Sequence, residues 1–193
     1  VFGYRLALCI AAIAQAGLLL QWRQWGGAWL WPWLLPLLLG VGLALRWIHI
    51  YLRPLHQALQ LLWLLGSVGF VALAISAGPV RMADAVASQP AWLWAIGPFF
   101  AALAGIGFKE FFCFRRLEAI GVTLLLPVAL LGALSGLLPA AASGSLMGVE
   151  AALLLVLTLR KFPMPAAADV GDKSVFAYLE EQRRVRSKSP DLT

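Results

Sequence analysis

Apolar residues fall into six long segments along the chain, separated by short polar or turn-rich stretches. The segments cover roughly residues 4–21, 28–45, 55–77, 91–108, 119–138 and 145–160. About 20 apolar residues in a helix cross the roughly 30 Å of hydrocarbon in a bilayer, so each segment predicts one transmembrane helix. Residues 34–45 lack the alternation of apolar and polar positions that a transmembrane β-strand needs. The pattern therefore predicts an all-α, polytopic membrane bundle of about six transmembrane helices.

The composition agrees with this pattern. Of the 193 residues, 62% are hydrophobic and only 12% are charged, whereas soluble domains carry about 25% charged residues. A chain of this size cannot hide such an excess in one core. We therefore expect residues 1–162 to form the transmembrane helical bundle and residues 163–193 to form a polar, basic cytoplasmic tail. Within the tail, the spacing of apolar residues over 174–185 predicts a short amphipathic helix.

Positive charges are distributed unequally between the two sides of this bundle. If the amino terminus faces the cytoplasm, thirteen Lys and Arg lie on the inner side, and only Arg23 and Arg81 lie on the outer side. The positive-inside rule then predicts that both termini are cytoplasmic, or stromal in a plastid-type membrane. Topology and lipid contact explain the net charge of +6 better than nucleic-acid binding does, since no basic-aromatic surface accompanies it.

Tryptophan is concentrated near the two connections that this topology places outside. Seven of the nine tryptophans lie there: Trp22, Trp25, Trp29, Trp31, Trp33, Trp92 and Trp94. The indole ring favours the membrane interface, where its body is apolar and its N–H stays hydrated. The belt therefore predicts anchoring at the outer interface, and the alternative is a surface that meets another protein or a pigment.

A polar stripe separates the second and third segments. If residues 46–60 form one helix, six polar side chains fall on one face: Arg46, His49, Arg53, His56, Gln57 and Gln60. Pro54 would kink such a helix, but proline is favourable in a first turn. In the alternative interpretation the third helix begins at Pro54, and the stripe consists of two pieces that meet at a bend.

The two histidines of the chain, His49 and His56, are candidate chlorophyll ligands. A neutral imidazole can ligate a metal ion, including the magnesium of a chlorophyll. On one helix, seven residues separate the two side chains by about 10 Å. That separation is too great for one metal ion, so no metal site is predicted, but it would suit two stacked pigments. The alternative is that both imidazoles hydrogen-bond loops or lipid headgroups at the interface.

The most charged connection spans residues 109–118. Its polar side chains are Lys109, Glu110, Arg115, Arg116 and Glu118. They predict a surface that binds a partner subunit, or a polar network that closes the inner end of the bundle, with Glu110 paired to a basic residue of the histidine loop. The alternative is an interfacial helix whose charges only set the topology.

Glu150 is the candidate ionisable residue within the membrane. It precedes Arg160 by ten residues, which is about 15 Å along a helix and places the carboxyl within the hydrocarbon. An ionisable group at such a depth is by default a hypothesis of function, for example proton coupling in a transporter. If the last helix is shifted outward, Glu150 lies near its outer end instead.

The sequence contains no catalytic signature such as HExxH, GxSxG, a Walker loop or GxGxxG. We therefore favour a non-enzymatic protein. A membrane enzyme is the third hypothesis, and its site would have to come from His49, His56, Glu110 and Cys113.

Two stretches carry a resemblance to a known family. One is His49–Gln57, continuing through Leu59, Gln60, Trp63 and Gly66, and the other runs from Gly97-Pro98 through Phe108–Phe114 to Glu118-Ala119. Together they resemble a family of integral membrane proteins from cyanobacteria and plastid-bearing organisms, catalogued as a domain of unknown function. The resemblance covers most of the bundle. The resemblance implies that the protein is located in the thylakoid or another cyanobacterial membrane, and it identifies no catalytic residue.

The leading hypothesis is an accessory or assembly protein of a photosynthetic membrane. Such a protein would associate with a larger complex, and in this setting chlorophyll or carotenoid becomes a more plausible cofactor than the spacing of the histidines indicates. The alternative is a small-molecule or ion transporter that uses Glu150 and the polar cytoplasmic mouth. A water-accessible path from Glu150 to the histidine stripe would favour transport, and a tightly packed interior would count against it.

Overall fold

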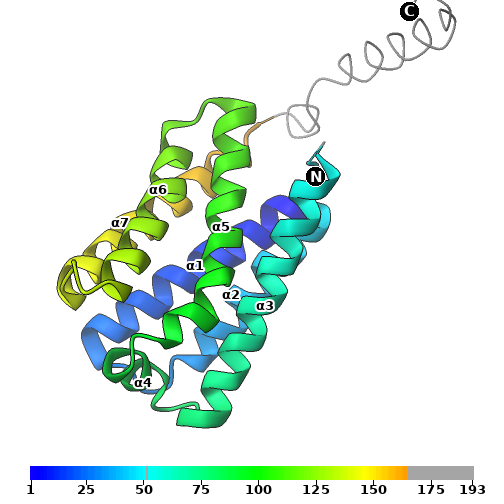
Figure 1. Cartoon of the computed structure of the whole chain (residues 1–193). Helices are drawn as coiled ribbons and strands as arrows, with labels where there is room; N and C mark the ends of the chain where they lie inside the picture. The colour runs from blue at the N-terminus through cyan, green and yellow to red at the C-terminus, as the bar shows by residue number, and fades with distance from the viewer. Residues whose placement is uncertain (51, 165–193) are drawn as a thin grey trace, which may run out of the picture.

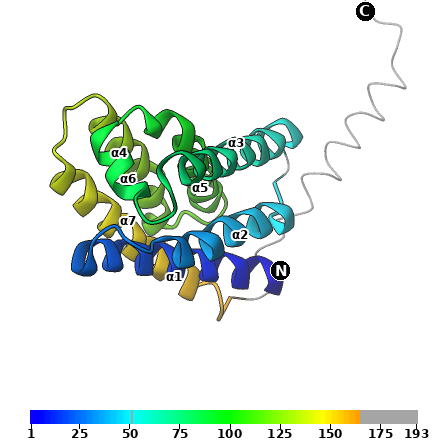
Figure 2. The same cartoon turned by 90° about the horizontal axis from the view of Figure 1, so that it is seen from below.

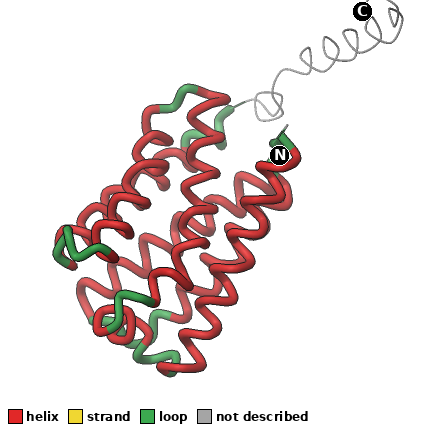
Figure 3. Tube along the Cα trace, viewed as in Figure 1, coloured by secondary structure: helices red, strands yellow, loops and turns green. Residues whose placement is uncertain are grey.

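The structure, a computed structural model, describes residues 1–50 and 52–164. These residues form seven helices joined by loops (Figure 3). The helices are α1 (Phe2–Trp25), α2 (Trp31–Trp47), α3 (Arg53–Ala77), α4 (Met82–Ser88), α5 (Trp92–Phe114), α6 (Leu117–Leu134) and α7 (Ala140–Leu159). Five are long and apolar enough to cross a membrane, and α2 is an apolar helix of 17 residues. The predicted all-α membrane bundle is confirmed.

Local sequence explains where several helices begin and end. Gly26 and Gly78 follow the last residues of α1 and α3 with positive φ angles of 85° and 80°, a conformation that glycine adopts without steric cost. Pro54 lies in the first turn of α3, where its missing N–H is not needed. The third helix therefore starts at Arg53, one residue before the proline, and the polar stripe is divided among the end of α2, the loop that follows and the start of α3.

The six longer helices form a closed ring around a central core. Around this ring each helix contacts the next, in the order α1, α2, α3, α5, α6, α7 and back to α1. Figure 1 shows the bundle from the side, and Figure 2 shows it from below. The short helix α4, which the hydrophobic pattern did not predict, contacts α3 and α5. We call the end that holds the start of α1 and the end of α7 the inner end, and the opposite end the outer end.

The closest approach of two helices is made by glycines of α3. A Cβ atom on Gly66 would lie 2.1 Å from the backbone nitrogen of Phe99, and one on Gly69 would lie 2.1 Å from the carbonyl oxygen of Ala95. Small residues let helix backbones approach within lipid in this way. The opposite face of α3 leaves large apolar side chains exposed, including Val71 and Ile75, as expected for a surface that faces hydrocarbon.

The helix limits differ from the predicted segments mainly at the inner end. The fourth segment was expected to end near residue 108, but α5 continues to Phe114. Lys109 and Glu110 therefore belong to a helix and are buried, whereas the pattern assigned them to a connection. The amphipathic helix predicted for residues 174–185 lies outside the described residues, as does the tail from residue 165 onward.

Candidate functional site

Four side chains meet at the inner end, and we call Tyr4, Lys109, Glu110 and Lys161 the inner-end cluster. Tyr4 comes from the first turns of α1, Lys109 and Glu110 come from α5, and Lys161 follows the end of α7. All four are buried, and Glu110 has no exposed surface. The cluster therefore links three segments that are far apart along the chain.

Both carboxylate oxygens of Glu110 accept hydrogen bonds. The Tyr4 hydroxyl donates to Oε1 at 2.7 Å, and Lys109 Nζ donates to the same oxygen at 3.1 Å. Lys161 Nζ donates to Oε2 at 2.6 Å. A buried carboxylate is tolerated when cationic donors satisfy it in this way. The partners of Glu110 come from α1, α5 and the end of α7, so the predicted pairing with a basic residue of the histidine loop is wrong.

Aromatic rings complete the surroundings of the two lysines. Lys161 Nζ lies 4.7 Å from the centre of the Phe114 ring and 5.3 Å from that of Tyr4. Lys109 Nζ lies 5.1 Å and 5.5 Å from the same two rings. A ring face attracts an ammonium group. The rings of Tyr4 and Phe114 therefore stabilise the buried ammonium groups of the two lysines.

A second layer of polar contacts surrounds this cluster. Arg5 donates through Nη1 to the carbonyl oxygen of Met164 at 2.7 Å. Glu118, at the start of α6, accepts from Arg160 at 2.5 Å and lies 4.0 Å from Arg116. These contacts join the starts of α1 and α6 to the ends of α5 and α7. Arg115 is exposed beside it.

The two histidines lie on different elements, so the spacing expected on one continuous helix does not apply. His49 is exposed in the loop after α2, and His56 is half-buried in α3. His56 Nε2 lies 2.6 Å from the carbonyl oxygen of Leu45, so this ring nitrogen already links α3 to α2. Arg46, Arg53 and Gln57 are exposed at the same corner.

Glu150 lies midway along α7 and is completely buried. It therefore sits inside the bundle and not near the outer end of its helix. Gln15 of α1, which is 1% exposed, donates a hydrogen bond from Nε2 to Glu150 Oε2. Within the described residues, Glu150 Oε1 and Gln15 Oε1 have no hydrogen-bond partner.

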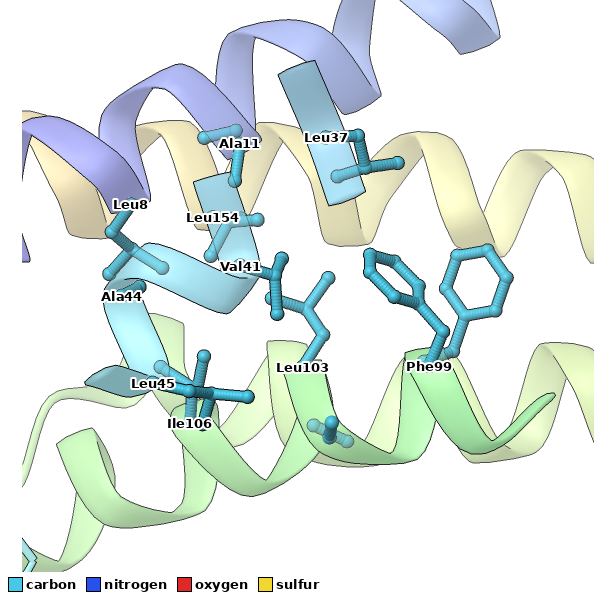
Figure 4. Close-up of a cluster of buried hydrophobic side chains, with 14 of the residues drawn as sticks. Leu8, Ala11, Leu37, Val41, Ala44, Leu45, Phe99, Leu103, Ile106 and Leu154 are labelled. Carbon is cyan, nitrogen blue, oxygen red and sulfur yellow. The ribbon is translucent and has the colours of Figure 1, made fainter. Parts of the chain in front are cut away.

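A tightly packed apolar layer forms the core beside these two polar regions. Figure 4 shows its side chains converging from α1, α2, α5 and α7. Leu8 of α1, Leu103 of α5 and Leu154 of α7 each have no exposed surface. Leu8 follows Tyr4 by one helical turn and Leu154 follows Glu150 by one turn toward the inner end, so these side chains lie between the two carboxylates along the bundle.

Sequence reasoning missed three residues of this arrangement. Tyr4 was part of an apolar segment, and Lys161 counted only as a topological charge. Gln15 carried a usable signal, because it interrupts an otherwise apolar stretch between Leu6 and Leu20. A polar residue in such a stretch is costly unless it has a partner in the bundle.

The comparisons with known proteins give one match. The model of a family described as "Uncharacterized integral membrane protein (DUF2301)" matches residues 43–178. This range begins near the end of α2 and includes all of α3 to α7. Neither the curated proteins nor the solved structures contain a match to the chain.

Proposed function

The chain belongs to this family of integral membrane proteins, and we propose that it serves as an accessory or assembly protein that docks onto a larger membrane complex through its inner end. One observation carries the proposal. Four exposed arginines lie at the inner end, where the inner-end cluster holds the helix ends together. They are Arg46, Arg53, Arg115 and Arg160. Complementary charge directs the docking and orientation of partner subunits. The positive-inside rule accounts for the sign of this surface, and docking would use the same charges.

The proposed setting is a photosynthetic membrane, either the thylakoid or another cyanobacterial membrane. It rests on the resemblance carried by residues 49–66 and 97–119. Chlorophyll or carotenoid is the proposed cofactor. Of the two histidines, His49 is the better proposed ligand, because its exposed ring has no hydrogen-bond partner among the described residues, whereas His56 Nε2 is engaged with Leu45.

Mild solubilisation of the native membrane tests this function. We expect the full chain to copurify with photosystem subunits and the preparation to absorb visible light. Arg46→Gln with Arg53→Gln should reduce the copurified subunits, and Arg23→Gln with Arg81→Gln, at the outer end, is the matched control. A protease-accessibility assay verifies that the topology of both variants is unchanged. A colourless preparation without photosystem subunits would contradict the proposal.

Transport is the second candidate function, and the burial of Glu150 beside Gln15 favours it, because an ionisable group at mid-membrane depth can carry a proton or bind a cation. The apolar layer around Leu8, Leu103 and Leu154 counts against a water-accessible path from Glu150 to the inner end. Proton flux into liposomes that contain the full chain tests the idea. Flux that Glu150→Gln abolishes would support transport, and equal flux in protein-free liposomes would exclude it.

A further inference from the structure

The outer half of the bundle contains a partly open cavity of about 380 Å³, which is within the range of small-molecule sites. All seven described helices contribute to its wall. The apolar part of the wall includes Trp22, Leu34, Leu73, Val86, Phe100 and Leu130. Because α4 contributes Val86, this short helix covers part of the outer end of the cavity.

Two polar side chains interrupt the apolar wall, and both are more than nine-tenths buried. They are Gln15 of α1 and Ser143 of α7. Gln15 Oε1 and Ser143 Oγ have no hydrogen-bond partner among the described residues. Glu150 lies behind Gln15, two helical turns from Ser143 on the same helix, and its Oε1 is also unpartnered.

These buried polar atoms would be stabilised by a hydrogen-bond partner. An unpaired polar group in an apolar surrounding costs free energy that a hydrogen bond would recover. A water molecule could pair with these atoms, but one water fills only about 30 Å³, and the rest of the cavity has an apolar wall. The cavity therefore suits an occupant with an apolar body and one polar end.

The hydrogen-bond donors and acceptors of the cavity indicate which polar group the occupant carries. The amide oxygen of Gln15 accepts hydrogen bonds and cannot donate them, whereas the Ser143 hydroxyl can do both. A hydroxyl group on the occupant would donate to Gln15 and accept from Ser143. A ketone would leave the Gln15 oxygen unpaired, and a hydrocarbon would leave both side chains unpaired.

We infer that this cavity binds a lipophilic alcohol or phenol, whose hydroxyl group pairs with Gln15 and Ser143 while its apolar body fills the space beneath α4. This site is independent of docking at the inner end, so the failure of one proposal leaves the other standing.

Equilibrium binding of tritiated farnesol to the detergent-solubilised full chain tests the inference. We expect saturable binding of one farnesol per chain. Farnesene has the same type of apolar body without the hydroxyl, and it should compete at least about fivefold more weakly, since one buried hydrogen bond is lost. A decyl-substituted hydroquinone, tested as a second competitor, distinguishes a phenol from an aliphatic alcohol as the preferred ligand.

Substitutions test separately whether binding depends on the polar atoms and whether it depends on the free volume of the cavity. Gln15→Leu and Ser143→Ala should each weaken farnesol binding by about fivefold or more. Ser145→Ala is the matched control, because Ser145 is exposed on the same helix and donates to the carbonyl oxygen of Ala141. Ala133→Phe introduces a ring into the cavity and should abolish binding while Gln15 and Ser143 remain. Size-exclusion chromatography shows which variants stay folded.

Three results would overturn the inference. The first is the absence of saturable farnesol binding to the folded wild-type chain. The second is equal competition by farnesene and farnesol, which indicates partition without recognition of the hydroxyl. The third is unchanged binding in Ser143→Ala and Ala133→Phe. Ser143→Ala removes a single oxygen, so this variant decides the outcome if the larger substitutions fail to fold.

Discussion

Glu110 and Glu150 are both fully buried carboxylates of the same bundle, yet their surroundings differ. Glu110 lies near the end of α5 and accepts hydrogen bonds at both oxygens, two of them from lysines. Glu150 lies midway along α7 and accepts one hydrogen bond, from the neutral amide of Gln15, while its other oxygen has no partner among the described residues.

The comparison shows that burial alone does not identify a functional carboxylate. Removal of a charge from water is offset only when cations and hydrogen-bond donors replace the lost hydration. The surroundings of Glu110 meet this condition, so its role is explained by holding helix ends together. The surroundings of Glu150 do not, and an incompletely satisfied polar group in the membrane is a candidate for function. Four predictions test this difference, from the largest expected effect to the smallest.

Glu110→Ala should have the largest effect on stability. Lys109 and Lys161 would lose the carboxylate they share, and breaking a buried ion pair costs about 3–5 kcal/mol. Unfolding of the detergent-solubilised chain in increasing mole fractions of SDS measures the loss. A decrease in the free energy of unfolding below about 1 kcal/mol would mean that Glu110 is no more important than a surface ion pair.

Tyr4→Phe should have the next largest effect. It removes the hydroxyl that donates to Glu110 and keeps the ring that lies beside the two lysines. Loss of a hydrogen bond to a charged group costs about 1.5–3 kcal/mol. The same SDS titration measures it, and an unchanged midpoint would show that the lysines alone satisfy Glu110.

Glu118→Gln should have a small effect at the same end of the bundle. Its partner Arg160 is more than half exposed, and such pairs contribute about 0.2–1 kcal/mol. The difference from wild type should shrink further at high ionic strength, because salt screens exposed charges. A loss as large as that of Glu110→Ala would place Glu118 within the structural core of the cluster.

The combined substitution Gln15→Leu and Glu150→Leu should change stability least. Replacement of both partners of a buried hydrogen bond by apolar groups is nearly neutral or stabilising. Glu150→Leu alone should destabilise more than the pair, since the Gln15 amide then stays unpaired. A double-mutant cycle measures this coupling. A double variant that unfolds as easily as Glu110→Ala would give both carboxylates the same structural role.

Part of this arrangement was predictable from particular residues. From its distance to Arg160, Glu150 was expected either within the hydrocarbon or near the outer end of its helix, and the structure buries it midway along α7. For residues 109–118 the sequence left a partner-binding surface, a polar network and an interfacial helix as alternatives, and the structure gives Glu110 three hydrogen bonds. The partners could not be predicted, because Tyr4 and Lys161 are distant in sequence and carry no shared pattern. The end of α5 was also misplaced, because charges were taken as a sign of a connection, although paired charges can remain in a helix.

The sequence by itself determined the class of the protein. Six long apolar segments without the alternation of barrel strands favour helices as the way to satisfy the backbone in lipid, and the Lys and Arg of the connections predict the orientation. Only the tertiary structure decided which polar residues are satisfied. Closing the ring brings Tyr4 and Lys161 to Glu110, brings Gln15 to Glu150, and leaves a cavity beneath α4. The reason is physical: hydrophobicity acts on each segment separately, whereas a buried hydrogen bond depends on which helices become neighbours.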